Sequence, residues 1–290
     1  MADMATRLRT VLVRRPGLCQ RGADPEVWHY GAGFDPVRAD QEHAAFCALL
    51  ESLGVDVRSL PDEDDGLADS IFPCDASIMT PHGAILLAPG KELRKGEPAL
   101  HAIAYRDLGV PVLGAIEAPG TAEGGDCFWL PTDDGLTLCV GRGLRTNDAG
   151  IQQLAAILAP FGIGVRGYDL AVGFGGVDAC LHLTSLVSAL DDRLAVVYTP
   201  LLPVAFHRDL LDAGYSLVHA DDSEFMATYG LNLNVLAVKP GNVVMLDNFP
   251  KTQAALLAAG VEVTTFDGGA LCMPCEGGPT CLTRPVWRAA

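Results

Sequence analysis

The strongest constraint on the fold of this chain is a local pattern that occurs five times. In each copy an apolar, helix-like stretch ends at a glycine, and a short run of alternating apolar residues follows. Because glycine accepts the left-handed conformation that stops a helix, each copy predicts a helix that leads into a strand. Successive glycines are 55, 53, 52 and 46 residues apart, a period that indicates repeated units. The five glycines are Gly54, Gly109, Gly162, Gly214 and Gly260.

A second apolar run follows each of these strands, and each run carries one chemically capable residue. If the copies are structurally equivalent, these five residues converge around one pseudo-symmetry axis. The pattern therefore predicts an α/β protein with a central site. A doubly wound α/β sheet would show similar copies, but no phosphate-binding glycine motif supports a nucleotide-binding protein. The five residues are Asp75, Glu123, His182, Asn234 and Cys281.

Composition limits the class of protein and its partners. The 290 residues are 49% apolar and 19% charged, which favours a compact globular protein; length alone allows one large domain or two. Asp and Glu number 36 against 20 Lys and Arg. This acidic balance opposes nucleic acid and anionic membranes as partners and suits a small cationic molecule.

The N-terminus and the cysteines predict a cytoplasmic protein. Residues 1–17 contain basic side chains but no apolar stretch of signal-peptide length, and no other run approaches a membrane span. Nine scattered cysteines fit free thiols in a reducing compartment better than a disulfide framework. Cys272 and Cys275 form a C-x-x-C without a second ligand pair, so we expect free thiols there and no zinc; a regulatory disulfide stays open.

Five motifs along the chain resemble, in order and spacing, the dimethylargininase branch of the pentein superfamily. The resemblance covers nearly the whole chain. It implies a single catalytic domain over residues 1–290, with five ββαβ-like repeats in a pseudo-fivefold propeller around a central active site. It also implies hydrolysis of a guanidine through a covalent S-alkylthiouronium intermediate, without a metal or organic cofactor. The motifs are FPCDASI (72–78), AEGGDCF (122–128), GRGLRTN (141–147), DACLHLTS (178–185) and GGPTCLTRP (277–285).

The resemblance and the chemistry of the residue types agree on a catalytic set. Cys281 is the expected nucleophile, because a thiolate attacks a resonance-stabilised guanidinium carbon far better than water does. A free cysteine has a pKa of about 8.5, so this thiol needs a nearby cation, either the substrate or protonated His182. His182 would protonate the departing amine and later deprotonate water. Glu123 would orient the imidazole and keep it protonated.

Five further residues are expected to bind the substrate. Asp75 would hold the guanidinium nitrogens through charge-assisted hydrogen bonds. Arg94 and Arg145 match the arginines that hold the substrate α-carboxylate in the family, and a planar guanidinium suits that task. Asp69 and Cys74 complete the expected binding set. Asn234 is left outside the expected site, with a structural role in its strand.

The identity of the substrate depends on two positions. Arginine deiminases and amidinotransferases carry an acid two residues after the histidine, and here Thr184 stands there. This favours a modified arginine: methylarginine or dimethylarginine, giving citrulline and methylamine or dimethylamine. Dimethylargininases commonly have Glu-Asp where this chain has Cys74 and Asp75, and the lost carboxylate leaves Nω-hydroxyarginine open. Ornithine and a urea derivative would form if the other carbon–nitrogen bond broke.

Other functions remain open at this point. An arginine deiminase or an amidinotransferase would use the same cysteine, and a non-catalytic pentein would bind a partner instead. A homodimer is left open. The segment 17–34, which is rich in glycine and contains Trp28 and Tyr30, is a candidate lid over the site.

Overall fold

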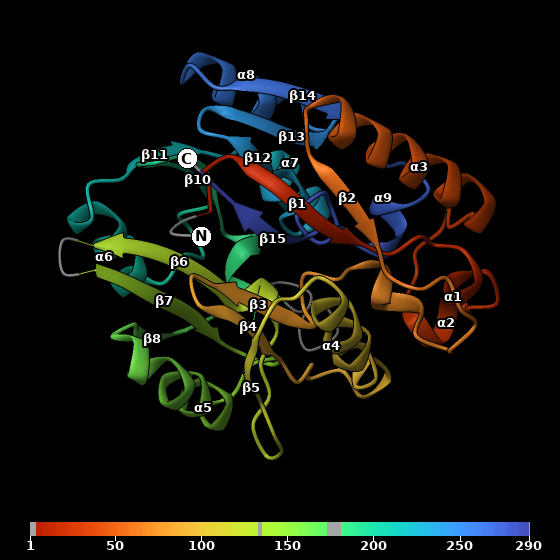
Figure 1. Cartoon of the computed structure of the whole chain (residues 1–290). Helices are drawn as coiled ribbons and strands as arrows, with labels where there is room; N and C mark the ends of the chain where they lie inside the picture. The colour runs from red at the N-terminus through yellow and green to blue at the C-terminus, as the bar shows by residue number, and fades with distance from the viewer. Residues whose placement is uncertain (1–3, 133–134, 173–180, 290) are drawn as a thin grey trace.

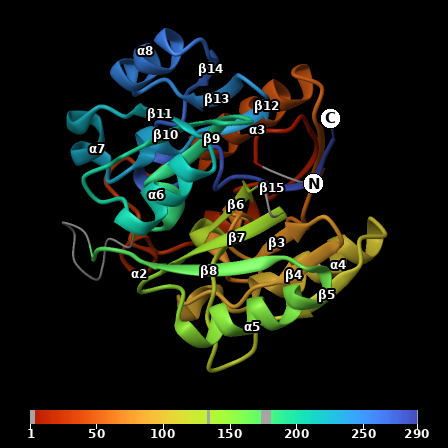
Figure 2. The same ribbon diagram turned by 90° about the vertical axis from the view of Figure 1, so that its left-hand side faces the viewer.

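The strands in the described part of the chain form five three-stranded sheets built on one plan. The computed structural model describes residues 4–132, 135–172 and 181–289. In each sheet the middle strand pairs antiparallel with one neighbour and parallel with the other, and a helix connects the parallel pair. This is the ββαβ unit, so the predicted fold class is confirmed. Figures 1 and 2 show the sheets around the middle of the molecule and the connecting helices toward its outside.

Four of the five units are continuous in sequence. The second unit consists of β3 (Ser77–Thr80), β4 (Gly83–Leu86), α4 (Glu97–Asp107) and β5 (Val112–Ala115). The third consists of β6 (Cys127–Thr132), β7 (Gly135–Arg142), α5 (Asp148–Leu158) and β8 (Gly164–Asp169). The fourth consists of β9 (Val187–Asp191), β10 (Leu194–Val197), α6 (Val204–Asp212) and β11 (Ser216–His219). The fifth consists of β12 (Leu236–Lys239), β13 (Asn242–Leu246), α8 (Pro250–Ala258) and β14 (Glu262–Phe266).

The first unit is assembled from both ends of the chain. Its members are β1 (Leu8–Val13), α3 (Pro36–Ser52), β2 (Asp56–Ser59) and, from the C-terminal end, β15 (Arg284–Arg288). Strand β15 pairs antiparallel with β1, with Val11 opposite Pro285. The two ends therefore lie side by side, as Figure 1 shows. This pairing closes the ring of units and fixes the loop that carries Cys281.

The five glycines of the repeat each follow the helix of a unit, as predicted. All five have positive φ, from 68° at Gly162 to 84° at Gly260. A side chain is strained in this left-handed region, which explains why the sequence places glycine where each helix turns into its strand.

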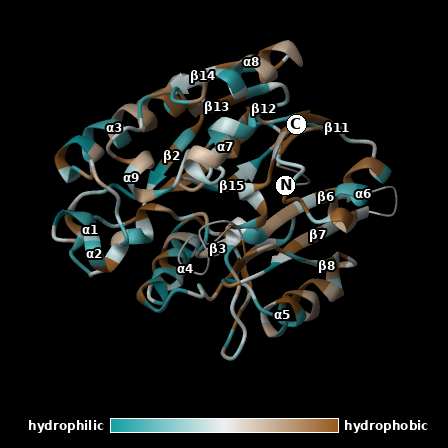
Figure 3. Cartoon of the chain, turned by 180° about the vertical axis from the view of Figure 1, so that it is seen from behind, coloured by the Kyte–Doolittle hydropathy of each residue, from teal (hydrophilic) through white to brown (hydrophobic). Residues whose placement is uncertain are grey.

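Apolar side chains fill the space between each helix and its sheet. In the third unit, Leu154 and Leu158 of α5 are fully buried in one cluster with Leu138 of β7. Figure 3 shows the helices striped with hydrophobic and hydrophilic residues, as expected when one face covers a sheet. Among the residues that the structure describes, no helix is both long and apolar enough to cross a membrane.

Short elements lie between the units and carry the site. The segment 17–34 contains two short helices, with Trp28 and Tyr30 both buried. The first three residues of the motif 178–185 lie outside the described part of the chain. The short α-helices are α1 (Leu18–Arg21), α2 (Pro25–Trp28), α7 (Asp222–Thr228) and α9 (Cys272–Cys275). The 3₁₀ turns are η1 (Ala68–Ile71), η2 (Glu92–Arg94), η3 (Gly124–Asp126), η4 (Ala159–Phe161), η5 (Leu183–Ser185) and η6 (Leu231–Leu233).

Candidate active site

The five residues singled out by the repeat occupy equivalent places in the five units. Each lies shortly before the first strand of its unit, at the inner end of that strand: β3, β6, β9, β12 or β15. Asp75, His182, Asn234 and Cys281 line one cavity. Glu123 is fully buried behind it and reaches His182. The structure thus brings all five positions together, including Asn234, which the sequence analysis left out.

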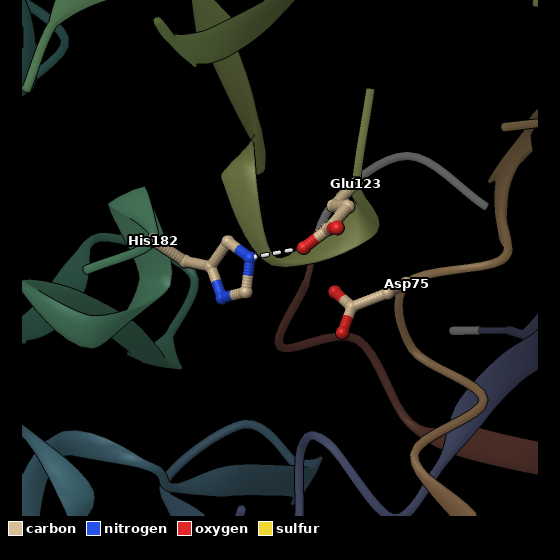
Figure 4. A group of neighbouring side chains, drawn as sticks. All are labelled: Asp75, Glu123 and His182. Atoms are coloured by element: carbon tan, nitrogen blue, oxygen red, sulfur yellow. Dashed lines mark hydrogen bonds and ion pairs between the residues drawn. The ribbon is translucent and has the colours of Figure 1, made fainter. Parts of the chain in front are cut away.

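Glu123 and His182 form a direct pair. Oε2 of Glu123 lies 2.6 Å from Nε2 of His182 (Figure 4). The other carboxylate oxygen accepts hydrogen bonds from the backbone N–H of Gly90 at 2.9 Å and from Nη1 of Arg145 at 3.3 Å. Burial alone would raise the pKa of Glu123, but the hydrogen bond and charge of His182, with the nearby Arg94 and Arg145, hold it below its ordinary value. Glu123 is therefore ionised.

The imidazole of His182 is held in its charged form. Burial disfavours the cation, but the carboxylates of Asp126, Asp75 and Glu123 raise the pKa of His182 well above its ordinary value. The second ring nitrogen, Nδ1, points away from Glu123 (Figure 4). A Cβ at Gly125 would lie 2.8 Å from both Cγ and Nδ1, so glycine is needed there for the ring to lie against the backbone. A protonated imidazole of this kind is a proton donor.

Asp75 presents a carboxylate at the same cavity. Oδ1 accepts a hydrogen bond from the backbone N–H of Gly125 at 2.8 Å, and Oδ2 lies 2.7 Å from Nη1 of Arg94. One ligand atom each from Asp75, Glu123 and His182 lies within 4.8 Å of the others, a spacing that could hold a metal ion. Each of these groups already has a charged partner, because Asp75 pairs with Arg94 and Glu123 pairs with His182.

Arg94 lines the cavity, but its guanidinium is directed at protein groups. Nε and Nη2 bind both oxygens of Glu97, at 2.8 and 2.9 Å, and Nη1 binds Asp75. Nη2 also donates to the carbonyl oxygen of Phe72 at 3.0 Å. All three nitrogens thus have partners, and the group is nearly fully buried. This differs from the expected grip on a substrate carboxylate: here Arg94 holds Asp75 in place, with Glu97 as its counter-ion.

Arg145 lies at the cavity, and its role in holding the substrate α-carboxylate stays a prediction. Its side chain is one-quarter exposed (25%) and lines the cavity, within 3.3 Å of the buried Glu123. Of the two expected arginines, Arg145 therefore has the better access to an incoming carboxylate.

Asp69 also lines the cavity, but it anchors the candidate lid. Oδ1 accepts a hydrogen bond from the hydroxyl of Tyr30 at 3.0 Å, and Oδ2 lies 2.7 Å from Nζ of Lys91. The same ammonium group lies 4.9 Å from the centre of the Trp28 ring, within cation–π range. Lys91 was not predicted, because an isolated lysine in a loop gives no sequence signal. Together these contacts hold segment 17–34 beside the site, with Trp28 lining the cavity.

Cys74 is not brought to this cavity. The turn before β3 directs Asp75 inward, whereas the Cys74 sulfur accepts a hydrogen bond from Nη2 of Arg284 at 3.0 Å. Cys74 lines a different, mainly apolar cavity together with Trp129 and Leu236. The expectation that Cys74 binds substrate therefore lacks a structural basis, because its side chain is buried beside Arg284 and does not line the cavity.

Cys281 lines the cavity with a partly buried side chain. Burial, followed by the neighbouring Cys74 and Asp75, raises the pKa of its thiol to about 12, whereas hydrogen bonds from Asn234 and the Gly278 backbone act in the opposite direction. The raised pKa favours the neutral thiol at pH 7. All eight cysteines in the described part of the chain, including those of the C-x-x-C, are free thiols.

Thr184, the neutral residue two positions after His182, also lines the cavity. Its hydroxyl donates to the carbonyl oxygen of Gly125 at 2.8 Å, so its own hydrogen is used inside the protein. Position 184 therefore adds no carboxylate to those of Asp75 and Asp69 at the cavity.

Comparison with known proteins establishes the family. A family model described as Arginine deiminase matches residues 205–288. The N(G),N(G)-dimethylarginine dimethylaminohydrolase of Streptomyces coelicolor is 33% identical to this chain, over 95% of the chain and 96% of that protein. The chain belongs to the dimethylarginine dimethylaminohydrolase family. The family member of Pseudomonas aeruginosa is 26% identical over 82% of the chain and 88% of its own length.

Solved structures show the same fold. The Pseudomonas aeruginosa family member, a cysteine-to-serine mutant complexed with citrulline, has a TM-score of 0.76 at 22% identity and covers 96% of this chain and 99% of that one. An amidinotransferase from Microseira wollei has a TM-score of 0.79 at 16% identity and covers 100% of this chain and 97% of that one. The same fold therefore occurs in a dimethylarginine dimethylaminohydrolase and in an amidinotransferase.

Proposed function

We propose that this chain hydrolyses free Nω-methylated arginine to citrulline and methylamine or dimethylamine. The observation that carries the proposal is the cavity in which Cys281, protonated His182 and Asp75 face one space, with ionised Glu123 buried behind the imidazole. Membership of the family supports the substrate, because two relatives are named N(G),N(G)-dimethylarginine dimethylaminohydrolase. Thr184 supports a modified guanidine over free arginine, since the second acid of arginine deiminases is missing.

Binding of the substrate prepares the nucleophile. The guanidinium would lie against Asp75, which Arg94 and the Gly125 backbone hold in position. The α-carboxylate would face Arg145. The positive guanidinium then offsets the burial that keeps the Cys281 thiol neutral, so the thiol loses its proton to solvent only when substrate is present.

In the first chemical step the Cys281 thiolate attacks the guanidinium carbon, and a carbon–sulfur bond forms. Nε2 of His182 is occupied by Glu123, so Nδ1 is the nitrogen that would pass its proton to the methylated nitrogen. The carbon–nitrogen bond breaks, the amine departs, and an S-alkylthiouronium remains on the sulfur.

In the second step the now neutral His182 takes a proton from a water molecule. The resulting hydroxide attacks the thiouronium carbon, the carbon–sulfur bond breaks, and the sulfur leaves as thiolate. Citrulline is released. Glu123 stays ionised throughout and stabilises the imidazolium each time it forms.

Several further predictions belong to this proposal. We infer that residues 1–290 act as a single catalytic domain without a metal or organic cofactor, on a small amino-acid substrate. A cytoplasmic location and the absence of nucleic-acid and membrane partners stay predictions from the sequence, and a homodimer remains open.

The test is formation of the ureido product, which is citrulline from arginine, Nω-methylarginine, Nω,Nω-dimethylarginine and Nω-hydroxyarginine, and N-carbamoylputrescine from agmatine, comparing wild type with Cys281→Ser. We expect the methylated arginines to be turned over best and the variant to be inactive. Agmatine, which lacks the α-carboxylate, should be a poor substrate if Arg145 holds that group. Preference for free arginine would identify an arginine deiminase. No turnover of any compound would overturn the hydrolase proposal.

A further inference from the structure

The fifth unit places a residue in contact with the reacting sulfur. Asn234 follows η6 and precedes β12, the place that Asp75, Glu123, His182 and Cys281 occupy in the other units. Its Nδ2 donates a hydrogen bond to the Sγ of Cys281 at 2.9 Å. All five units therefore place the residue at this position in or next to the active site.

The orientation of the Asn234 amide is fixed by the protein. Its Oδ1 accepts a hydrogen bond from the backbone N–H of Thr280 at 2.8 Å. A backbone N–H can only donate, so the oxygen must face Thr280 and the NH₂ group must face the sulfur. The backbone of Asn234 is held in turn by its N–H bond to the carbonyl oxygen of Leu231 at 3.0 Å.

The nucleophile loop is shaped around this amide. A Cβ at Gly278 would lie 2.7 Å from Cγ of Asn234, so glycine is required for the loop to pass so closely. The Thr280 hydroxyl donates to the carbonyl oxygen of Val235, next to Asn234, at 3.1 Å. One side chain therefore holds both the backbone before Cys281 and its sulfur atom.

The electrostatic surroundings give this contact its importance. Burial, Cys74 and Asp75 all disfavour the thiolate of Cys281, and the groups that favour it are the Asn234 amide and the Gly278 backbone N–H. Hydrogen bonds to an ionised acceptor are stronger than those between neutral groups. The contact therefore strengthens when the thiol ionises and again when sulfur leaves the thiouronium.

We propose that Asn234 is a catalytic residue that stabilises the Cys281 thiolate through its side-chain amide and holds the sulfur toward the bound substrate. The inference rests on Cys281 being the nucleophile of the proposed reaction. It does not depend on which guanidine is the substrate.

The test is the rate of Cys281 alkylation by iodoacetamide at fixed pH, without substrate, followed by mass spectrometry of the peptide that contains Cys281. Peptide resolution is needed because the chain has nine cysteines. Asn234→Ala removes the donor, and we expect alkylation to slow about tenfold or more. Asn234→Asp keeps an oxygen for the Thr280 N–H but places a negative charge beside the sulfur. Its alkylation rate should therefore fall further than that of Asn234→Ala.

Thr283→Val is the matched control. It removes a hydrogen bond within the same loop, from the Thr283 hydroxyl to the carbonyl oxygen of Pro279 at 2.9 Å, but leaves the Asn234 amide intact. We expect alkylation within about twofold of wild type, since the donor to the sulfur is retained. If the alkylation rate of this control falls as much as that of Asn234→Ala, increased mobility of the loop explains the effect. That result would overturn the proposal.

Two other outcomes would also overturn it. In one, the Asn234 variants fold and their Cys281 is alkylated at the wild-type rate. The other is failure of both variants to fold, which would assign Asn234 a structural role. Citrulline formation is measured separately, so the absence of turnover in the wild type would refute the proposed function while leaving the alkylation result to decide the role of Asn234.

Discussion

Nη1 of Arg94 lies 2.7 Å from Oδ2 of Asp75, and both side chains are almost fully buried. The carboxylate proposed to bind the substrate is therefore already paired with a protein cation, which fixes its position before substrate arrives. The same guanidinium forms a bidentate salt bridge with Glu97. These three residues form one buried cluster, in which Asp75 and Arg94 line the cavity and Glu97 does not.

This cluster predicts a large effect of Glu97→Ala on stability. Burial raises the pKa of Glu97 to about 7, so the comparison is made at about pH 8, where its carboxylate is mainly ionised. Its removal there leaves part of a buried charge uncompensated, and we expect the free energy of unfolding to fall by about 3–5 kcal/mol. The measurement is unfolding in guanidinium chloride. Asp107→Ala, which breaks the exposed Arg106–Asp107 pair, is the control and should cost under about 1 kcal/mol. Equal effects of the two substitutions would contradict this description of the cluster.

Glu123→Gln should change both the rate and its pH dependence. The glutamate raises the pKa of His182, so the isosteric amide should lower that pKa and move the alkaline limb of kcat/KM to lower pH. Because imidazolium is the proton donor, activity is lost as pH rises through the pKa of His182. We expect a rate loss of about 10²-fold or more at neutral pH. An alkaline limb that stays in place would exclude the assigned role.

Alkylation of the free enzyme should show no plateau near neutral pH. With the pKa of Cys281 raised to about 12, the thiolate fraction increases about tenfold per pH unit over the whole accessible range. Peptide-resolved iodoacetamide labelling without ligand measures this slope. A plateau near neutral pH would instead indicate a standing ion pair between Cys281 and His182.

Gly125→Ala should disable the site with little effect elsewhere. The new methyl group would lie 2.8 Å from the His182 ring and 3.0 Å from Oδ1 of Asp75, so both groups must move. We expect kcat to fall about 10²-fold, since a displacement of about 1 Å costs that much. Gly22→Ala, where a Cβ meets nothing within 4 Å, is the control and should keep wild-type kinetics. Normal kinetics of Gly125→Ala would contradict the close packing.

His101 predicts a loss of stability in acid. Burial lowers the pKa of His101 to about 3, so between that value and about 6.5 the unfolded chain binds a proton that the folded protein does not. Stability should thus fall as pH drops, by about 2 kcal/mol from this group between pH 7 and about pH 5. Comparison of unfolding at both pH values in wild type and His101→Gln isolates this contribution. Parallel pH profiles would refute it.

The sequence predicted the repeat because its signals are local. A glycine with positive φ after each helix leaves a mark within a few residues, and all five glycines carry it. The pairing of β15 with β1 joins residues almost a full chain apart, and no local pattern reports such a contact. The sequence alone therefore did not show that the C-terminal strand belongs to the first unit.

Side-chain direction explains what the sequence analysis missed in the site. Motifs located Asp75 and Cys74 together, but only the folded turn shows that one faces the cavity and the other faces Arg284. Asn234 had the correct repeat position, yet its contact with Cys281 depends on how a loop 47 residues later folds around it. Glu97 and Lys91 lie in no motif, so only their contacts reveal them.

The most direct test of the central claim is acid quenching of wild-type enzyme during turnover of Nω,Nω-dimethylarginine, followed by mass spectrometry. We expect a thiouronium adduct on the peptide that contains Cys281, which appears before citrulline and is absent in Cys281→Ser. Citrulline formed by the Cys281→Ser variant, or an adduct on Cys275, which lines the same cavity, would contradict it.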